Sequence, residues 1–462
     1  MGREMERSYR GQTVLVVGAA RSGVASAEFL LARGARVVLS DAKSEANLPV
    51  SLTPLRKVAQ ASGELILELS GHKPESFRHC DFVVVSPGVP LTHPMFVESR
   101  KAGIPILAEI ELASRHIKGR ILGITGSNGK TTTTTLVAEL LRGAGLRGFA
   151  AGNIGTPLIS FARASTPDDF YVVELSSFQL ESIHEFHPFV GAILNLTPDH
   201  MDRYHDFEDY IGAKRRIFMN QTAADFAVLN ADDPRTSAMA SQVSSAPVLF
   251  SRRAEVARGT FVKKGRLVYR DGRGDMGLFP ADAIRLKGGH NLENVLAACA
   301  LALLAGAAPG SLEGGVRAFA GVEHRLEFVA ELDGIQYFND SKATNVDATI
   351  KSLEAFPRNI VLIAGGRDKG GDFLPLRPLV AQRVKHLIVI GEAAGKIRDA
   401  LSDAVETSAA ASLPEAVTLA SRKASPGDVV LLAPACASFD MFQNYEHRGR
   451  VFKEAVSSLA RK

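Results

Sequence analysis

A glycine-rich segment near residue 126 constrains the fold of this chain more than any other feature. The apolar run 120–125 precedes it, the segment contains Gly126, Gly129 and Lys130, and a helical pattern over 135–142 follows. A strand, a glycine turn and a helix in this order bring backbone N–H groups and the positive end of a helix to a phosphate, whose outer oxygens the lysine reaches. The segment therefore predicts an α/β core that binds ATP.

The spacing of this segment differs from that of a standard P-loop, because Ile124 stands where a glycine is expected. A chance match is therefore an alternative. Two strand-like runs argue against it, since one ends at Glu174 and the other shortly before Asp199 and His200. Open parallel sheets bind ligands at the carboxyl ends of their strands. We therefore expect these side chains to meet there with the hydroxyl of Thr131, in a site suited to Mg²⁺.

The composition argues against several classes of protein. The 462 residues suffice for about two to four domains. The net charge is +4 and charges of both signs are interspersed, so nothing predicts nucleic-acid binding. Three cysteines stand in no paired or metal-ligand spacing, which favours the reducing cytoplasm. The longest apolar run, 295–308, is shorter than the ~18–20 residues of a membrane span, so it predicts a buried helix and no transmembrane segment.

Alternating strand-like and helix-like runs divide the chain into three blocks. We expect them to be domains of residues 1–108, 109–321 and 322–462. Strand-like runs in the third block lie at 335–338, 360–364, 386–390 and 429–432. Such alternation predicts an α/β fold class with parallel sheets.

The first block opens like a dinucleotide-binding unit. A strand leads into a turn at Gly18 and Gly23, and a helix and a second strand follow, ending at Asp41. Ala20 stands where the fingerprint has its second glycine. A loop with Gly88 follows the next strand-like run. An oxidoreductase that uses this block is therefore an alternative, although no second block supplies hydride chemistry.

A lysine lies on the apolar stripe of the helix expected from Phe207. Phe207, Ile211, Lys214 and Phe218 fall at positions i, i+4, i+7 and i+11, so they share one helix face. A lysine is costly there. Either its amine snorkels to solvent, or it points into the site, where burial favours the neutral amine. A neutral amine can take up CO₂ as a carbamate with two anionic oxygens, but the residues alone do not show this modification.

Other segments allow two interpretations each. Asn291 suits a helix N-cap, but Asn291 and Asn294 also share a helix face and could meet a nucleotide base together. Arg325 could form a surface salt bridge or reach a γ-phosphate. Loops rich in Ser, Thr, Lys and Gly follow strands of the third block, at 339–345, 365–369 and 434–440. Turn chemistry explains each alone, but together they suit a small zwitterion or dicarboxylate.

Seven short segments, in order, resemble the Mur ligases, and the resemblance extends from about residue 12 to 455. They are T-G-S-N-G-K-T (125–131), G-N-I-G (152–155), E-L-S-S-F-Q-L (174–180), D-H-M-D-R (199–203), G-H-N (289–291), E-H-R (323–325) and N-D-S-K-A-T-N (339–345). Within the family, 340–345 and 434–440 most resemble the members that add D-glutamate.

The resemblance implies three domains: a Rossmann-like N-terminal domain for the UDP-sugar substrate, a central P-loop-type ATPase domain with a mainly parallel sheet, and a Rossmann-like C-terminal domain for the amino acid. It implies a cytoplasmic, monomeric ligase of peptidoglycan precursor synthesis. This enzyme would add D-glutamate to UDP-N-acetylmuramoyl-L-alanine through an acyl phosphate, using ATP and two Mg²⁺ ions. A scaffold with a vestigial ATP site is the non-enzymatic alternative.

The resemblance also implies roles for individual residues. The ATP phosphates would contact Gly126, Ser127, Asn128, Gly129, Lys130, Thr131 and Thr132. One Mg²⁺ would bind Thr131 and Glu174, and the second His200 and carbamylated Lys214. The adenine would lie near Asn291, Asn294 and His324. Asn153 would face the active centre and Arg325 a phosphate. The uridine diphosphate would lie near Arg21, Ser22, Asp41 and Gly88. D-Glutamate would contact Lys342, Thr344, Lys369, Ser438 and Tyr445. The catalytic set would be Lys130, Glu174, His200, Lys214 and Arg325.

Overall fold

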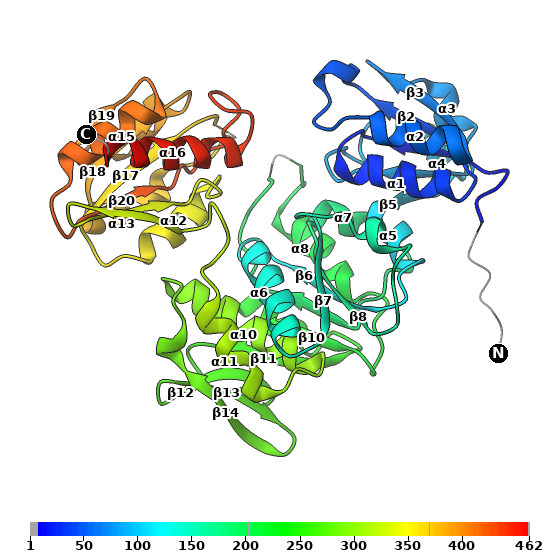
Figure 1. Cartoon of the computed structure of the whole chain (residues 1–462). Helices are drawn as coiled ribbons and strands as arrows, with labels where there is room; N and C mark the ends of the chain where they lie inside the picture. Colours follow the sequence, from blue (N-terminus) through cyan, green and yellow to red (C-terminus); the bar gives the residue numbers. More distant parts are fainter. Residues whose placement is uncertain (1–7, 202, 369, 461–462) are drawn as a thin grey trace. The chain divides into compact units, whose positions relative to one another are not determined.

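The computed structural model describes residues 8–201, 203–368 and 370–460. Three α/β regions follow one another along the chain, each built around its own sheet (Figure 1). The described residues divide into two compact units. One runs up to residue 261 and adds 268–278 and 297–312, and the other comprises 262–267, 279–296 and the chain from 313 onward.

The first sheet has five strands in the order β3-β2-β1-β4-β5, with neighbouring strands parallel. Its elements are β1 (Thr13–Val17), α1 (Arg21–Ala32), β2 (Arg36–Asp41), α2 (Thr53–Ser62), β3 (Glu64–Leu69), α3 (Pro74–Arg78), β4 (Phe82–Val85), α4 (Met95–Lys101) and β5 (Ile106–Ala108). Val14 and Val16 pack into one core and Leu15 and Val17 into another, as alternation predicts for a strand covered on both faces. The strand order reverses between β1 and β4, where such sheets bind ligands.

The second sheet has nine strands in the order β14-β13-β12-β11-β10-β9-β6-β8-β7, and each pair from β12 to β7 in that order is parallel. Its strands are β6 (Arg120–Thr125), β7 (Arg147–Gly152), β8 (Asp169–Glu174), β9 (Val190–Ile193), β10 (Phe226–Asn230), β11 (Ala246–Ser251), β12 (Gly259–Lys263), β13 (Arg266–Asp271) and β14 (Gly274–Pro280). Strand β6 lies between β8 and β9 and is parallel to both, so Thr125 and Glu174 end at the same edge of the sheet.

Helices of this stretch of the chain are α5 (Glu109–Ser114), α6 (Lys130–Gly143), α7 (Ser177–Glu181), α8 (Phe207–Arg215), α9 (Pro234–Met239), α10 (Gly289–Leu304) and α11 (Leu312–Ala318). Single 3-10 turns in the described chain span Glu45–Asn47, Leu158–Phe161, Arg216–Phe218, Ala281–Ala283, Pro309–Ser311 and Leu374–Leu376. The apolar run 295–308 lies largely in α10, which is buried as expected.

The third sheet has six strands in the order β15-β16-β20-β17-β18-β19. Its elements are β15 (Glu327–Leu332), β16 (Ile335–Asn339), α12 (Val346–Glu354), β17 (Ile360–Gly365), α13 (Arg377–Arg383), β18 (Val384–Ile390), α14 (Ala394–Leu401), β19 (Thr407–Ala409), α15 (Leu413–Lys423), β20 (Val429–Leu432) and α16 (Tyr445–Leu459). All pairs are parallel except β15 with β16, which is a tight antiparallel hairpin. Its two strands are separated only by Asp333 and Gly334, which is too short for a crossover.

The structure corrects two details of the sequence interpretation. The helix after the glycine loop begins at Lys130 rather than at residue 135, because Gly129 takes a left-handed φ of 83° and turns the chain directly into the helix. Asn291 is not an N-cap, since α10 already begins at Gly289 and the Asn291 side chain donates back to the carbonyl of Lys287 at 2.7 Å.

The cysteines and the apolar helices bear on the expected cellular compartment and on the expected absence of a membrane span. All three cysteines are buried and free of disulfide bonds. Within the described ranges, no helix combines the length and apolar character that crossing a membrane requires.

Candidate functional site

The glycine loop between β6 and α6 is held by hydrogen bonds to the segment that follows β9. The backbone N–H groups of Ser127 and Asn128 donate to the main-chain and side-chain oxygens of Asn195 at 3.0 and 2.8 Å. Ser127 Oγ donates to Thr197 O at 2.8 Å. Lys130 Nζ lies over the loop itself, 2.6 Å from Gly126 O and 2.7 Å from Ser127 O. The predicted loop residues therefore form one rigid cradle at the N-terminus of α6.

A buried carboxylate stands beside this cradle at the end of β8. Thr131 Oγ1 donates to Glu174 Oε2 at 2.8 Å, and Asn153 Nδ2 donates to Glu174 Oε1 at 3.0 Å. Both carboxylate oxygens are thus oriented by neighbours. Gly152 at the end of β7 lies close to the backbone of β8, because a Cβ there would lie 2.4 Å from the carbonyl oxygen of Glu174. The structure brings together three residues that the sequence placed in one site: Thr131, Asn153 and Glu174.

Lys214 does not snorkel to solvent. Its side chain is only 1% exposed, and Nζ lies 3.0 Å from Gly126 O and 3.4 Å from Thr125 Oγ1. Burial, followed by the charge of Lys130, holds the pKa of Lys214 well below its ordinary value, and the opposite pull of Asp199 and Glu174 is weaker. The amine therefore adjoins the glycine loop in a place where burial favours its neutral form, as the second interpretation of the sequence expected.

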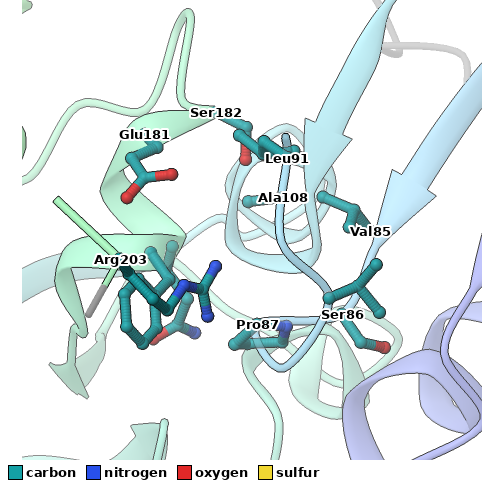
Figure 2. A pocket seen from close by; sticks show the side chains of 11 residues that line it. Val85, Ser86, Pro87, Leu91, Ala108, Glu181, Ser182 and Arg203 are labelled. Carbon is teal, nitrogen blue, oxygen red and sulfur yellow. The ribbon is translucent and has the colours of Figure 1, made fainter. Parts of the chain in front are cut away.

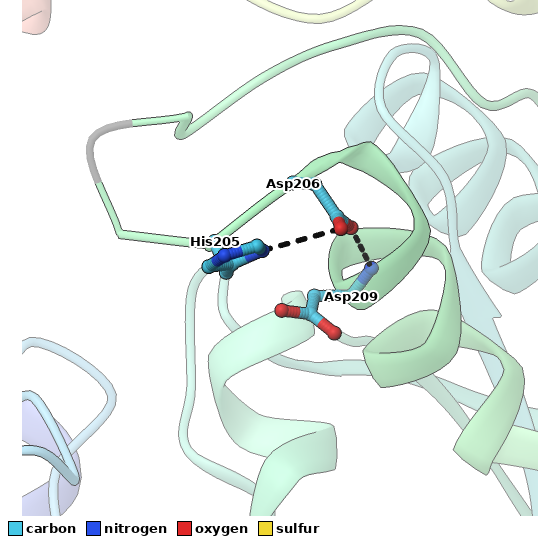
Figure 3. Close-up of side chains that lie close together, drawn as sticks. All are labelled: His205, Asp206 and Asp209. Atoms are coloured by element: carbon cyan, nitrogen blue, oxygen red, sulfur yellow. Dashed lines mark hydrogen bonds and ion pairs between the residues drawn. The ribbon is translucent and has the colours of Figure 1, made fainter.

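The start of α8 is capped by a cluster that resembles a metal site but serves the helix. Asp206 Oδ1 accepts from the backbone N–H of Asp209 at 2.9 Å, and Asp206 Oδ2 pairs with His205 Nδ1 at 3.2 Å (Figure 3). All three residues are exposed. This N-cap satisfies a backbone N–H at the start of the helix that carries Lys214.

His200 belongs to an aromatic cluster around Phe178. The His200 ring packs against Phe178 with centroids 4.9 Å apart, and Arg203 Cζ lies 3.7 Å from the Phe178 ring centre. Tyr204 stacks on the same ring and donates its hydroxyl to Glu181 at 2.5 Å. Phe178 was not predicted as part of this cluster, because one aromatic residue in a short helix is typical of a core position.

The candidate residues of the first domain lie at or beyond the carboxyl ends of β1, β2 and β4. Asp41 Oδ2 accepts from the N–H of Ala19 at 2.6 Å, so this acid holds the glycine turn after β1. Arg21 Nη1 lies 3.5 Å from Gly155 O, at the far end of the G-N-I-G segment. Ser22 lies in the first turn of α1, where its carbonyl accepts from Ser26 Oγ.

Gly88 has open space where a Cβ would stand. A small cavity nearby is lined by residues that follow β4 and by residues of α7 and the loop beyond it. Those labelled in Figure 2 include Ser86, Pro87, Glu181 and Arg203.

The C-terminal candidates gather around His324 and Tyr445. His324 is buried, its Nδ1 lies 2.9 Å from Asn339 Nδ2, and its ring meets Tyr445 edge-on. Burial lowers the pKa of His324, so the neutral ring is favoured. Lys342 Nζ lies over the Tyr445 ring at 5.2 Å.

The loops on either side of this cluster carry the other C-terminal candidates. The N–H of Thr344 donates to Lys342 O at 2.8 Å, and Ser438 is buried. Lys369 lies outside the described residues.

The remaining nucleotide candidates also have defined surroundings. Asn294 Nδ2 donates to Asn291 Oδ1 at 3.1 Å, so the two amides share a helix face as expected. The charge of Arg325 acts on Asp340, whose pKa is nevertheless raised by burial. The hydroxyl of Ser352 holds Asp340 at 2.5 Å. The charge of Arg325 therefore reaches the 339–345 loop, where it favours the ionised form of Asp340.

Comparison with known proteins identifies the class to which this fold and site belong. Family models match residues 12–108 (Mur ligase MurD-like, N-terminal domain), 124–302 (Mur ligase middle domain) and 324–436 (Mur ligase, glutamate ligase domain). The chain belongs to the Mur ligase family.

Two curated relatives are each named UDP-N-acetylmuramoylalanine–D-glutamate ligase. The one from Koribacter versatilis is 50% identical, covering 98% of both chains, and the one from Geotalea uraniireducens is 49% identical, covering 96% of this chain and 97% of the relative. A solved UDP-N-acetylmuramate-alanine ligase from Thermotoga maritima shares the fold with a TM-score of 0.61 at 21% identity, over 97% of this chain and 100% of the other.

Proposed function

We propose that this protein joins D-glutamate to UDP-N-acetylmuramoyl-L-alanine at the expense of ATP, in the synthesis of peptidoglycan precursors. Relatives that are about 50% identical over nearly the whole chain are named UDP-N-acetylmuramoylalanine–D-glutamate ligase. The observation that carries the proposal is the group at the glycine loop. The Glu174 carboxylate is held by Thr131 of α6, and the buried amine of Lys214 lies on the carbonyl of Gly126.

The donor set fits ATP with Mg²⁺. Glu174 and Thr131 offer the oxygen ligands that Mg²⁺ prefers, and the N-terminus of α6, which begins at Lys130, offers backbone N–H groups to phosphates. A carbamate on Lys214, with His200, would complete a second position. When bound, Mg²⁺ neutralises the negative charge that develops on the transferred phosphoryl group.

The reaction proceeds in two steps. A carboxylate oxygen of UDP-N-acetylmuramoyl-L-alanine attacks the γ-phosphorus, the bond to the ADP oxygen breaks, and an acyl phosphate forms. The D-glutamate amine then attacks the acyl carbon, and inorganic phosphate leaves with the former carboxylate oxygen as the amide forms. Lys130 and Arg325 contribute positive charge to the phosphoryl group.

Substrate contacts are assigned by domain, with boundaries at 1–108, 109–321 and 322–462. Adenine contacts Asn291, Asn294 and His324. The uridine diphosphate contacts Arg21, Ser22, Asp41 and Gly88, and Asn153 faces the reacting centre. D-Glutamate contacts Lys342, Thr344, Lys369, Ser438 and Tyr445. The enzyme acts as a cytoplasmic monomer on small molecules and binds no nucleic acid.

The acyl-phosphate step has a direct test. UDP-N-acetylmuramoyl-L-alanine labelled with ¹⁸O in its terminal carboxylate is incubated with the enzyme, ATP, Mg²⁺ and D-glutamate. One ¹⁸O atom should appear in each inorganic phosphate released, because that oxygen bridges carbon and phosphorus in the intermediate. Unlabelled phosphate accompanying amide product would refute this mechanism.

A further inference from the structure

Arg448 is an arginine with 0% exposure near the start of α16. Burying a guanidinium is costly unless each of its donors finds an acceptor. It lies one turn after Tyr445, which the proposed function places at the amino-acid site. The side chain therefore requires an explanation that helix packing alone does not supply.

The guanidinium joins two loops to the helix. Arg448 Nε donates to Ser341 Oγ at 2.9 Å and Nη2 to Ser341 O at 2.7 Å. Nη1 and Nη2 each lie 3.2 Å from Cys436 O, and Nη1 lies 3.3 Å from Ala437 O. Ser341 Oγ in turn donates to Tyr445 O at 2.8 Å. These acceptors belong to the loops after β16 and β20, which are adjacent parallel strands.

Two of the three residues that Arg448 contacts, Ser341 and Ala437, are next to a proposed D-glutamate contact. Ser341 precedes Lys342, and Ala437 precedes Ser438. Gly366 admits the guanidinium closely, because a Cβ there would lie 3.1 Å from Nη1. Burial lowers the pKa of Arg448 to about 10, so the group stays charged at neutral pH and its donors keep the strength of charged hydrogen bonds.

We propose that Arg448 is a positioning residue that fixes the 341 loop and the 436–437 loop against α16 and so sets the affinity for the dicarboxylate amino acid. It acts through Lys342 and Ser438 and rests on the proposed function. The planar fork is essential to the role, because a single ammonium cannot span acceptors on two loops.

The variants Arg448→Lys and Arg448→Met test this role, and Arg450→Met is the matched control. Arg450 is exposed on the same helix two residues on. Both Arg448 variants should raise the KM for D-glutamate by about tenfold or more, since several charged hydrogen bonds are lost, while the KM for ATP changes less than about threefold. Arg450→Met should leave both values unchanged. A third variant, Arg448→Ala, removes the whole guanidinium-bearing side chain and should also raise the KM for D-glutamate. Added guanidinium ion should partly lower that KM, because it can occupy the space and donate to the same acceptors.

Ser341→Ala is the second measurement where an Arg448 variant does not fold, since it removes only the hydroxyl link. It should raise the KM for D-glutamate in the same direction by a smaller factor. Equal rises in the KM values for D-glutamate and ATP, or no change in either, would overturn the positioning role. Failure of the wild type to use D-glutamate would instead overturn the proposed function.

Discussion

At the residue scale, two lysines contact the glycine loop: Lys130 is partly exposed, and Lys214 is buried. Lys130 lies on the carbonyls of Gly126 and Ser127, whereas Lys214 reaches the same loop from within the core. Lys130→Ala should lower kcat by at least about a hundredfold, because a charge aimed at the phosphates is removed. Phosphate release at saturating ATP measures this, with circular dichroism as the control for folding. Near-normal turnover would contradict the ATP assignment.

Lys214 carries the most specific chemical prediction. Lys214→Ala should be nearly inactive because it deletes the amine that would form the carbamate. Short carboxylic acids such as acetate or propionate should restore part of the activity, since their carboxylate can occupy the space and replace the carbamate oxygens. Ethylamine of similar size should not. Rescue by the amine instead of the acids would contradict an anionic role at this position.

At the element scale, helix α5 is tied to its surroundings by two buried glutamates of opposite character. Glu111 accepts from the backbone N–H groups of His184, Glu185 and Phe186, at 2.9 to 3.2 Å. These bonds, together with Arg115, lower the pKa of Glu111 although burial opposes them. Glu109 accepts from Ile159 N at 2.7 Å, and its burial raises its pKa to about 7. One acid is therefore stabilised as an anion and the other as a neutral group.

Glu109→Gln should change the pH dependence of stability. Between its ordinary pKa of 4.5 and about 7, the unfolded chain loses the proton that the folded chain keeps, so stability falls as pH rises through this window. The amide cannot ionise. The variant should therefore exceed the wild type by about 2–3 kcal/mol at pH 8 and match it near pH 4, in urea unfolding. Glu111→Gln should destabilise at neutral pH, and a stabilised variant there would contradict this account.

Gly449 of helix α16 lies close to the imidazole ring of His324. A Cβ at Gly449 would lie 2.2 Å from His324 Nδ1. Gly449→Ala should displace this ring, lowering stability by about 1–3 kcal/mol and weakening nucleotide binding in titration calorimetry. Gly395→Ala is the control, because α14 has open space at that position and alanine favours a helix. An unaffected Gly449→Ala would show that His324 is free to move.

The parts of the fold that the sequence predicted best are those with uniform burial. Strand β20 is a continuous apolar run and coincides with the predicted range 429–432. No such apolar run marks β13 and β14, which are partly exposed and rich in charged and glycine residues. The antiparallel β15 was also missed, because alternating half-exposed side chains do not reveal the direction of pairing.

At the scale of the whole molecule, the sequence predicts those site residues that lie at the ends of strands or within short local motifs. Thr131 and Glu174 meet because β6 and β8 are parallel neighbours. Arg448 could not be predicted, since a lone arginine in an amphipathic helix is normally solvated and its acceptors lie more than a hundred residues away along the chain or in the turn before α16. Phe178 was not predicted either, because a single aromatic residue in a short helix is typical of a core position and only the tertiary structure shows its contact with His200.

The central claim is tested most directly by phosphate release from ATP with Mg²⁺ and UDP-N-acetylmuramoyl-L-alanine, while amino acids are offered one at a time. We expect release that depends on D-glutamate and does not occur with L-glutamate, glycine or a diamino acid, accompanied by a product whose mass has increased by one glutamyl residue. Release with another acceptor would keep the ligase chemistry and refute the assignment of the 339–345 and 434–440 loops. No release with any acceptor would contradict the account as a whole.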